Sequence, residues 1–378
     1  MTDFAKTRAL FDIPEGMIYL NGNSLGPMPK HAPEALQSFM MDEWRSELIK
    51  GWNTKGWFMQ TNTLGDRIAP LVGAAKGTIV VSDTLSIKVF QAVAAAMALV
   101  PDRRVILSDS GNFPTDLYMV EGLMQLKDKG YELRTPSPEK VLDQITPEVA
   151  VVMVTEVDYR TGRKHDMAAL IDKAHACGAV VVWDLAHSVG AVPVDVTATD
   201  ADFAVGCTYK YLNAGPGAPA FIYVAPRLMD VVEPALSGWY GHESPFAFDL
   251  GFRPMPGKIE RMRIGTPAVA TFPILHAALD IWDQVDMADV RNKSIELSEL
   301  FIQQVEARCP GVTFAGPRDP AQRGSHVPFR FEHGYPCMQA LIAQNVIGDF
   351  RAPDIMRHSA HNSSQVKKVS HQRPCYYD

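Results

Sequence analysis

Two segments of the chain decide its fold: VVVWDLAH at residues 180–187 and FAVGCTYK at residues 203–210. Each is an apolar run of strand length that ends abruptly in ionisable residues. In a parallel sheet, the carboxyl ends of neighbouring strands meet at one edge, and ligands bind at that edge. The two segments therefore predict that Asp184 and His187 converge with Lys210 on one crevice.

An aspartate and a lysine at such an edge are the two protein groups that pyridoxal phosphate chemistry needs most. The lysine forms a Schiff base with the cofactor, and the aspartate pairs with its pyridinium nitrogen. Each residue alone has a plainer explanation, because polar residues often close strands and a lone lysine is usually solvated. Two consecutive segments with complementary groups, followed by Gly215-Pro216-Gly217, favour a cofactor site.

The rest of the chain shows the alternation of strands and helices that is typical of a mostly parallel sheet covered on both faces. The clearest predicted helix has Asp166 as its cap and Gly178 as its left-handed stop. Glycine, proline and aromatic residues at 238–256 predict a long loop, and long structured loops are often functional. The predicted strands are 79–82, 104–108, 149–154 and 219–224, and the predicted helices are 85–100, 114–129, 167–177 and 274–308.

This pattern divides the chain into four parts. Turn-forming residues at 19–29 indicate an N-terminal arm over 1–40. The α/β rhythm predicts a large domain over 41–270, and a smaller α+β pattern predicts a second domain over 271–357. The remaining stretch, 358–378, is polar, lacks apolar periodicity and predicts a disordered tail.

Composition indicates an ordinary globular protein. The chain has 378 residues, is 47% hydrophobic and carries a formal net charge of -7 with both signs interspersed. No basic face is evident, so neither nucleic acid nor a membrane surface is an expected partner. The five cysteines are scattered and form no C-x-x-C pair, and the first residues lack an apolar core. These features predict a cytoplasmic protein with reduced thiols.

Six blocks of the sequence match one protein family in order along the chain. They are GNSLG at 22–26, FPTD at 113–116, WDLAHSVG at 183–190, CTYKYLN at 207–213, GWYGH at 238–242 and FRAP at 350–353. On these residues the chain resembles the kynureninase family of fold-type I (aspartate aminotransferase-like) pyridoxal phosphate enzymes. The resemblance implies an α/β fold of the PLP-dependent transferase type, with a mostly parallel sheet in the large domain and a smaller α+β domain.

The resemblance also implies the roles of individual residues. Lys210 would carry the cofactor and move protons, Asp184 would keep the ring an electron sink, and Tyr209 would give general acid or base help. The phosphate would be held from one subunit by Tyr209 and by Leu85 and Ser86 at a helix N-terminus. From the other subunit it would be held by Trp239 and Thr266, which implies a homodimer. The implied cofactor-binding residues are Leu85, Ser86, Phe113, Asp116, Thr155, Asp184, His187, Tyr209, Lys210, Trp239 and Thr266. Without the family, Ser86 would be read as a plain helix cap and Phe113 as a core residue.

For the substrate, the resemblance implies hydrolysis of L-kynurenine to anthranilate and L-alanine. Arg357 matches the arginine that clamps the amino-acid carboxylate, for which a guanidinium fork is well suited. Ser24 and Trp52, together with Thr266, match positions that line the aromatic end of the pocket. Trp52 and Thr266 resemble the bacterial type of the family, which predicts a preference for L-kynurenine over its 3-hydroxy form.

After Arg357 the sequence departs from the family pattern. The family continues into another strand and further helices, whereas this chain reads HSAHNSSQVKKVSHQRPCYYD. If those elements are missing, the small sheet has an uncovered edge and Arg357 becomes a mobile clamp. His358, His361 and His371 offer a metal site as an alternative, but no carboxylate or cysteine stands at ligand spacing, and no metal is expected.

Two other functions remain open on the sequence. A class V aminotransferase or a cysteine desulfurase would share the scaffold, although a desulfurase needs a catalytic cysteine on a mobile loop, and neither Cys309 nor Cys337 lies in a recognisable one. A truncated, non-catalytic protein that keeps the cofactor fold is the third possibility, which only the divergent tail favours.

Overall fold

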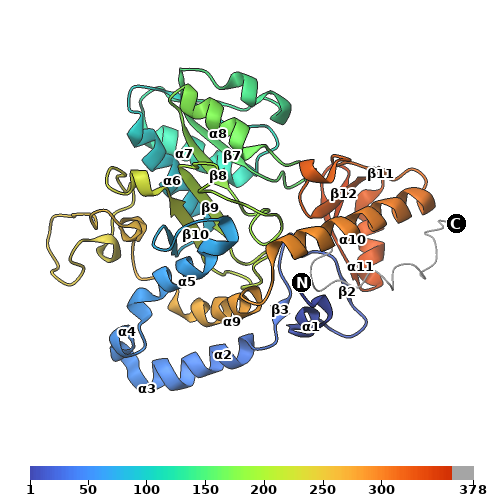
Figure 1. Cartoon of the computed structure of the whole chain (residues 1–378), viewed down its shortest axis with the longest axis horizontal. Coiled ribbons are helices and arrows are strands. Elements are labelled where there is room, and N and C mark those ends of the chain that lie inside the picture. Colours follow the sequence, from blue (N-terminus) through green and yellow to red (C-terminus); the bar gives the residue numbers. More distant parts are fainter. Residues whose placement is uncertain (360–378) are drawn as a thin grey trace.

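The computed structural model describes residues 1–359 of the chain. Most of the predicted tail lies outside these residues. None of the helices within 1–359 combines the length and the apolar character needed to cross a bilayer. The described part contains a large sheet domain, a smaller domain built on a second sheet, and an N-terminal arm that contacts both (Figure 1).

The large domain is built on a seven-stranded sheet in the order β4-β10-β9-β8-β7-β5-β6. Strand β10 runs antiparallel to both of its neighbours, and the pairs from β9 to β6 are all parallel. The predicted mostly parallel sheet is therefore confirmed. The strands are β4 (Ile79–Val81), β5 (Val105–Leu107), β6 (Glu132–Arg134), β7 (Val149–Thr155), β8 (Val180–Asp184), β9 (Phe203–Cys207) and β10 (Ala220–Val224).

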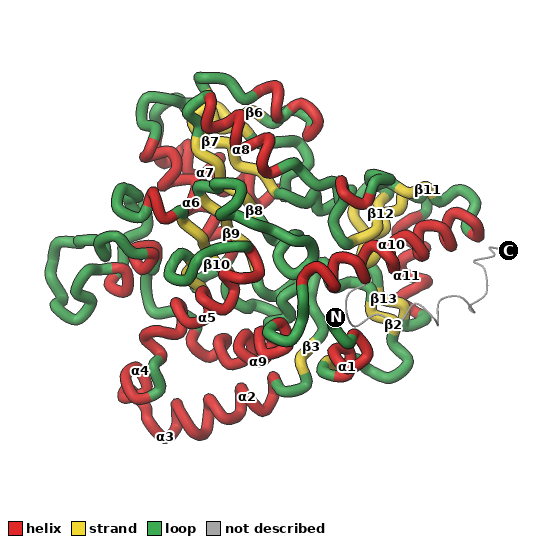
Figure 2. The backbone as a smooth tube through the Cα atoms, viewed as in Figure 1, coloured by secondary structure: helices red, strands yellow, loops and turns green. Residues whose placement is uncertain are grey.

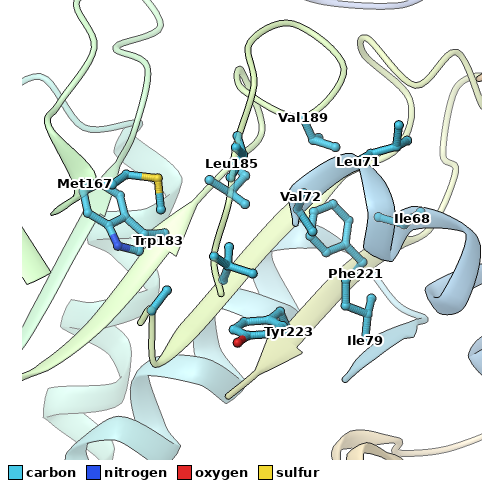
Figure 3. Packing of buried hydrophobic residues seen from close by; sticks show 14 of the residues in the cluster. Ile68, Leu71, Val72, Ile79, Met167, Trp183, Leu185, Val189, Phe221 and Tyr223 are labelled. Carbon is cyan, nitrogen blue, oxygen red and sulfur yellow. The ribbon is translucent and has the colours of Figure 1, made fainter. Parts of the chain in front are cut away.

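These strands are apolar throughout because both faces of the sheet are covered. Alternate residues belong to two separate cores, so that Trp183 faces one side and Val182 the other. Figure 3 shows part of the first of these cores, in which Trp183 lies beside Met167, and Phe221 lies by Val72 and Ile68 from the segments before β4. The helices of this domain are α5 (Gln60–Ile68), α6 (Leu85–Leu99), α7 (Pro114–Lys127), α8 (Met167–Ala176) and α9 (Phe272–Trp282).

The small domain has a four-stranded antiparallel sheet in the order β11-β12-β15-β14. The long helix α10 crosses it, and Figure 2 shows this helix running from the large domain over the second sheet. Phe329, Met356 and Met338 form its core with Ile302 of α10. The elements are α10 (Met287–Arg308), β11 (Thr313–Phe314), β12 (His326–Arg330), α11 (Gly334–Ala343), β13 (Val346–Ile347), β14 (Asp349–Arg351) and β15 (Ile355–Ser359).

The N-terminal arm joins the two domains. Strand β2 pairs in parallel with β13 of the small domain, while α2 packs against α9 of the large one. The arm consists of α1 (Phe4–Ala9), β1 (Phe11–Asp12), β2 (Ile18–Tyr19), β3 (Met28–Pro29) and α2 (Ala32–Ser38), and α3 (Arg45–Glu47) and α4 (Gly51–Thr54) continue from it.

Two sequence-based expectations need correction here. The predicted helix 274–308 is two helices, because α9 ends at Trp282 and Asp286 caps a new helix by accepting hydrogen bonds from the amides of Ala288 and Asp289 at 2.8 and 3.0 Å. Helix α9 packs on α2 and α5, whereas α10 contacts strands β11 and β12 of the second sheet.

The predicted start of the disordered tail at His358 is also wrong. His358 and Ser359 are the last residues of β15, both are buried, and both have partners in β12. The Ser359 amide also donates to the Leu20 carbonyl at 2.7 Å. The polar residues at the end of β15 gave no sign of a strand. They are part of one because β15 is an inner strand, and backbone hydrogen bonds to both neighbouring strands hold it regardless of its side chains.

Candidate active site

The register of the large sheet brings the predicted residues to one edge. Thr155 at the end of β7 is level with Asp184 at the end of β8, and Asp184 is level with Val205 of β9. Lys210 follows β9 by three residues. The carboxyl ends of three neighbouring strands therefore open on the same crevice, as their sequences predict.

Lys210 is buried in this crevice, with 9% of its surface exposed. Its Nζ lies 3.1 Å from Nε2 of His187, and it faces the rings of Phe113 and Tyr209 at 5.9 and 5.8 Å from their centroids. Burial, followed by the charge of Lys210, holds the pKa of His187 well below its usual range. His187 is therefore a neutral partner of the lysine amine, and does not compete with it for a proton.

The GNSLG block lies directly against this lysine. The Gly26 amide donates to the Tyr209 carbonyl at 2.9 Å. A Cβ atom on Gly26 would stand 2.2 Å from the Lys210 carbonyl oxygen, which is shorter than any tolerated contact. The glycine is thus required by the close approach of the N-terminal arm to the lysine.

Two buried carboxyl groups lie beside the lysine. Asp184 accepts a hydrogen bond from the Ala186 amide at 2.8 Å, and its second oxygen is 3.4 Å from the Thr155 hydroxyl. Burial raises the pKa of Asp184, although the charge of Lys210 opposes the shift. Burial, followed by the charge of Asp184, raises the pKa of Asp116 well above its usual range. The two shifts keep one carboxyl of this pair neutral, and the charge of Lys210 favours the ionised form of Asp184.

Asn112 organises this side of the site, and the sequence analysis missed it. Its Oδ1 accepts from the Thr155 hydroxyl and, at 2.7 Å, from the Phe113 amide, and its Nδ2 donates to Ser108 at 2.9 Å. The side chain therefore fixes Phe113 and Thr155 relative to Asp184. Its position directly before the FPTD block was the available signal.

Arg357 forms the opposite end of the site, on β15 of the small domain. It is 1% exposed, and its Nη2 forms an ion pair with Asp349 and donates to the Ser24 hydroxyl at 3.2 Å. Its Nη1 donates to the Tyr159 carbonyl. The expected mobile clamp is therefore wrong, because an inner strand and a buried carboxylate fix the guanidinium. Asp349, which lies in β14, was not predicted.

Leu85 and Ser86 are the first two residues of α6, at the same edge of the sheet. In the sheet, Phe221 of β10 pairs with Val81 of β4 on one side and with Gly206 of β9 on the other. Strand β4, which precedes Ser86, and strand β9, which precedes Lys210, therefore end at the same height in the sheet. Thr84 precedes α6 in an extended conformation and makes no side-chain cap. The first amides of α6 are thus donors suited to an anion.

The resemblance assigns Trp239 and Thr266 to the other subunit's site and Trp52 to the substrate pocket. Trp52 packs edge-on against Trp239 with ring centroids 6.1 Å apart, in a cluster that includes Phe58 and Tyr240. Thr266 is exposed. The ring contacts of Trp52 and Trp239 are with each other and with neighbouring aromatic side chains.

The solved structures most informative about this arrangement are cysteine desulfurases. The apo enzyme from Thermococcus onnurineus NA1 superposes with a TM-score of 0.81 at 19% identity, covering 97% of this chain and 95% of its own. CsdA from Escherichia coli gives 0.81 at 22% identity, covering 98% and 96%. Together with the lysine and aspartate at the sheet edge, this likeness defines the fold as that of the fold-type I pyridoxal phosphate enzymes.

Sequence comparison narrows the class. Kynureninase from Pseudomonas fluorescens is 48% identical over 360 residues, covering 93% of this chain and 86% of its own, and kynureninase from Burkholderia pseudomallei (strain K96243) is 47% identical with the same coverage. The kynureninase C-terminal domain family matches residues 290–363. The chain belongs to the kynureninase family.

Proposed function

We propose that this chain catalyses the pyridoxal phosphate-dependent hydrolysis of L-kynurenine to anthranilate and L-alanine. The observation that carries the proposal is the pairing of two ends in one site: a buried lysine beside buried carboxyl groups in the large domain, and a buried arginine fixed by Asp349 in the small domain. The first end suits the cofactor and the second suits the carboxylate of an amino acid.

The residues present fit the cofactor. Asp184 is a carboxylate whose ionised form is disfavoured by burial, so a pyridinium nitrogen beside it would be a stabilising partner. Among residues 1–359, Oδ2 of Asp116 and Nδ1 of His187 have no hydrogen-bond partner, and both face the same crevice as polar groups able to contact ring substituents. Phe113 is available to stack on the ring, and the α6 N-terminus suits a phosphate.

When bound, pyridoxal phosphate supplies an aldehyde that combines with amines and a ring that accepts electrons. Lys210 would hold the aldehyde and then take and return a proton at the substrate Cα, because no other described lysine lies in the crevice. Tyr209 would act as a proton donor at the same edge: burial raises its phenol pKa, so the hydroxyl keeps its proton. Arg357 would orient the substrate by its carboxylate.

The rival enzymes are less well supported. Cys337 lies within helix α11 and Cys309 directly follows α10, so neither occupies an extended loop at the crevice as a desulfurase would need. The non-catalytic alternative rested on the divergent tail, most of which lies outside residues 1–359, and within those residues Arg357 is held by an ion pair with Asp349. The deciding experiment is product analysis with L-kynurenine. Anthranilate and L-alanine support the proposal, whereas a keto acid product, or none, contradicts it.

We also propose that the chain acts as a homodimer in the cytoplasm, with the Trp52, Trp239 and Thr266 set reaching the partner's site. Large apolar side chains are exposed in the segments just before Trp52 and after Trp239, among them Ile49 at 78%, Phe248 at 77% and Leu250 at 106%. Apolar surface left exposed on one chain favours burial against a partner.

Subunit mixing tests the sharing of sites. Lys210→Ala and Trp239→Ala homodimers should each be nearly inactive, and a mixture refolded together should regain activity, because one of the two sites in a heterodimer has both residues intact. A mixture no more active than its parents contradicts the shared site, and sedimentation of a monomer contradicts the dimer.

A further inference from the structure

His326 is a buried histidine on the face of the small sheet that points toward the large domain. In β12 it is adjacent to Ser359 of β15, while Val327, the next residue, lies in the small-domain core. The His326 ring lies 5.9 Å from the His187 ring, between centroids, and is 0% exposed. His326, from the small domain, therefore lies next to His187, which contacts the Lys210 amine.

Neither ring nitrogen of His326 has a hydrogen-bond partner among residues 1–359. Buried polar groups in native proteins are nearly always hydrogen-bonded, so an unpaired one calls for an explanation. Burial, followed by the charges of Arg357 and Lys210, lowers the pKa of His326 to about 3. The ring is therefore neutral at any working pH, with one N–H to donate and one nitrogen to accept.

The position of His326 lies between the two ends of the site. Arg357 pairs with Pro328, two residues along β12, so His326 and Arg357 are diagonal neighbours on one face, a spacing that long side chains can bridge. An amino acid whose amine lies toward Lys210 and whose carboxylate lies toward Arg357 must pass beside His326.

Arg357 alone leaves a carboxylate incompletely bound. Of its five N–H groups, three are directed to Asp349, Ser24 and the Tyr159 carbonyl. A carboxylate can accept about four hydrogen bonds. A neutral donor beside the guanidinium would complete its coordination without adding a second buried charge.

We propose that His326 is a substrate-binding residue, whose ring N–H donates to the α-carboxylate of the amino-acid substrate beside Arg357. This inference rests on the proposed function for the identity of the substrate. It makes His326 a determinant of specificity for amino acids over the corresponding amines, because only the carboxylate uses its donor.

The test is spectral titration of the cofactor-loaded enzyme with pairs of ligands that differ only in the carboxylate: L-alanine against ethylamine, and L-kynurenine against its decarboxylated amine. His326→Leu removes both nitrogens, while His326→Asn and His326→Gln keep a donor near Nδ1 and Nε2 respectively. His358→Leu is the matched control, since His358 is equally buried on the same strand pair but lies against Phe301 and Phe329 on the opposite face.

In His326→Leu we expect amino-acid affinity to fall about 10- to 100-fold, the size typical for a hydrogen bond to a charged group, with amine affinity unchanged. The melting temperature should stay the same or rise, one of the two amide variants should recover most of the loss, and His358→Leu should bind normally. KM for L-kynurenine should rise more than kcat falls.

Equal losses for amino acid and amine, an unchanged amino-acid affinity, or the same loss in His358→Leu would each overturn the assignment. If His326→Leu fails to fold, the two amide variants decide the matter, because affinity lost in both contradicts a donor role. Alanine and ethylamine binding need no turnover, so the inference can be judged even if wild-type enzyme does not hydrolyse kynurenine.

Discussion

The two ends of the site treat buried charge in opposite ways. At the large-domain end, Asp116 and Asp184 are buried next to each other and burial raises both pKa values. At the small-domain end, Asp349 is also buried but forms ion pairs with Arg357 and Arg351. At the first end the charge of Lys210 opposes the shift without outweighing burial, whereas at the second end two arginines pair directly with the carboxylate.

This difference assigns the two ends different tasks. Buried acids that lack a direct ion pair are costly, and such arrangements concentrate at functional sites. A satisfied ion pair instead holds one side chain in one orientation. Changes at the first end should therefore affect chemistry and cofactor binding, and changes at the second should affect substrate affinity and folding.

The largest effect should come from Lys210→Ala, which removes the only described amine in the crevice. We expect the visible absorbance of the bound cofactor to change to that of free cofactor and turnover to fall to background. Borohydride reduction followed by peptide mapping should label Lys210 in the wild type. Lys293→Ala, a surface change on α10, is the control, and label on any other lysine would contradict the assignment.

Arg357→Ala tests the small-domain end. KM for L-kynurenine should rise at least about 10- to 100-fold, while cofactor absorbance stays normal. The change also leaves Asp349 buried without its main partner, which should cost up to about 3 to 5 kcal/mol of stability. Steady-state kinetics and urea unfolding measure the two effects.

The double variant Arg357→Ala with Asp349→Asn separates the loss of substrate affinity from the loss of stability. Removing the orphaned charge should recover stability but not affinity. Recovery of both, or normal KM in Arg357→Ala, would show that the arginine is structural and does not clamp the substrate.

Much of the large-domain end of the site could be predicted from the sequence, but little of the small-domain end could. Strands such as 180–184 can be recognised from their apolar runs, and parallel pairing then predicts that their carboxyl ends share one edge of the sheet. Asp349 could not be found this way, because its role depends on β14 and β15 lying side by side, and β15 itself has the polar sequence IMRHS.

His326 and the break between α9 and α10 were missed for different reasons. A histidine in a strand carries no sign of whether its ring lies in the core or in the crevice, because tertiary pairing decides that. The four-residue break leaves the apolar pattern of 274–308 undisturbed, and its local signal was Asp286, a residue type that commonly caps helices.

A smaller effect is expected on substrate choice. With Trp52 and Thr266 in place, kcat/KM for L-kynurenine should exceed that for 3-hydroxykynurenine, because the added hydroxyl would be buried without a partner. Trp52→His with Thr266→Asn, the residues of the animal type, should shift the ratio about 10-fold toward the hydroxylated substrate. Equal or better use of 3-hydroxykynurenine by the wild type would overturn this prediction.

The smallest effect concerns Glu156, another buried acid of the large domain, which directly follows Thr155 at the end of β7. It is 2% exposed, and its Oε2 has no hydrogen-bond partner within residues 1–359. Burial raises its pKa from 4.5 to about 7, against the opposing effects of Ser188, Lys164 and Arg291. Unlike Asp349, it has no ion pair with any of residues 1–359, so ionisation of its carboxyl should cost stability.

The sign follows from proton binding. Between pH 4.5 and about 7 the folded state holds a proton on Glu156 that the unfolded state has lost, so stability falls as pH rises through this window and stays reduced above it.

The variant Glu156→Gln tests this, because its side chain cannot ionise. Relative to wild type it should gain stability from pH 4.5 to 7, reaching at most about 3 kcal/mol at pH 8. Unfolding at pH 5 and pH 8 measures the gain, with Glu121→Gln on exposed α7 surface as the control for loss of one charge. A difference between Glu156→Gln and wild type that does not change with pH would mean that Glu156 is already ionised at pH 5, and that the large-domain end holds this charge as firmly as the small-domain end holds Asp349.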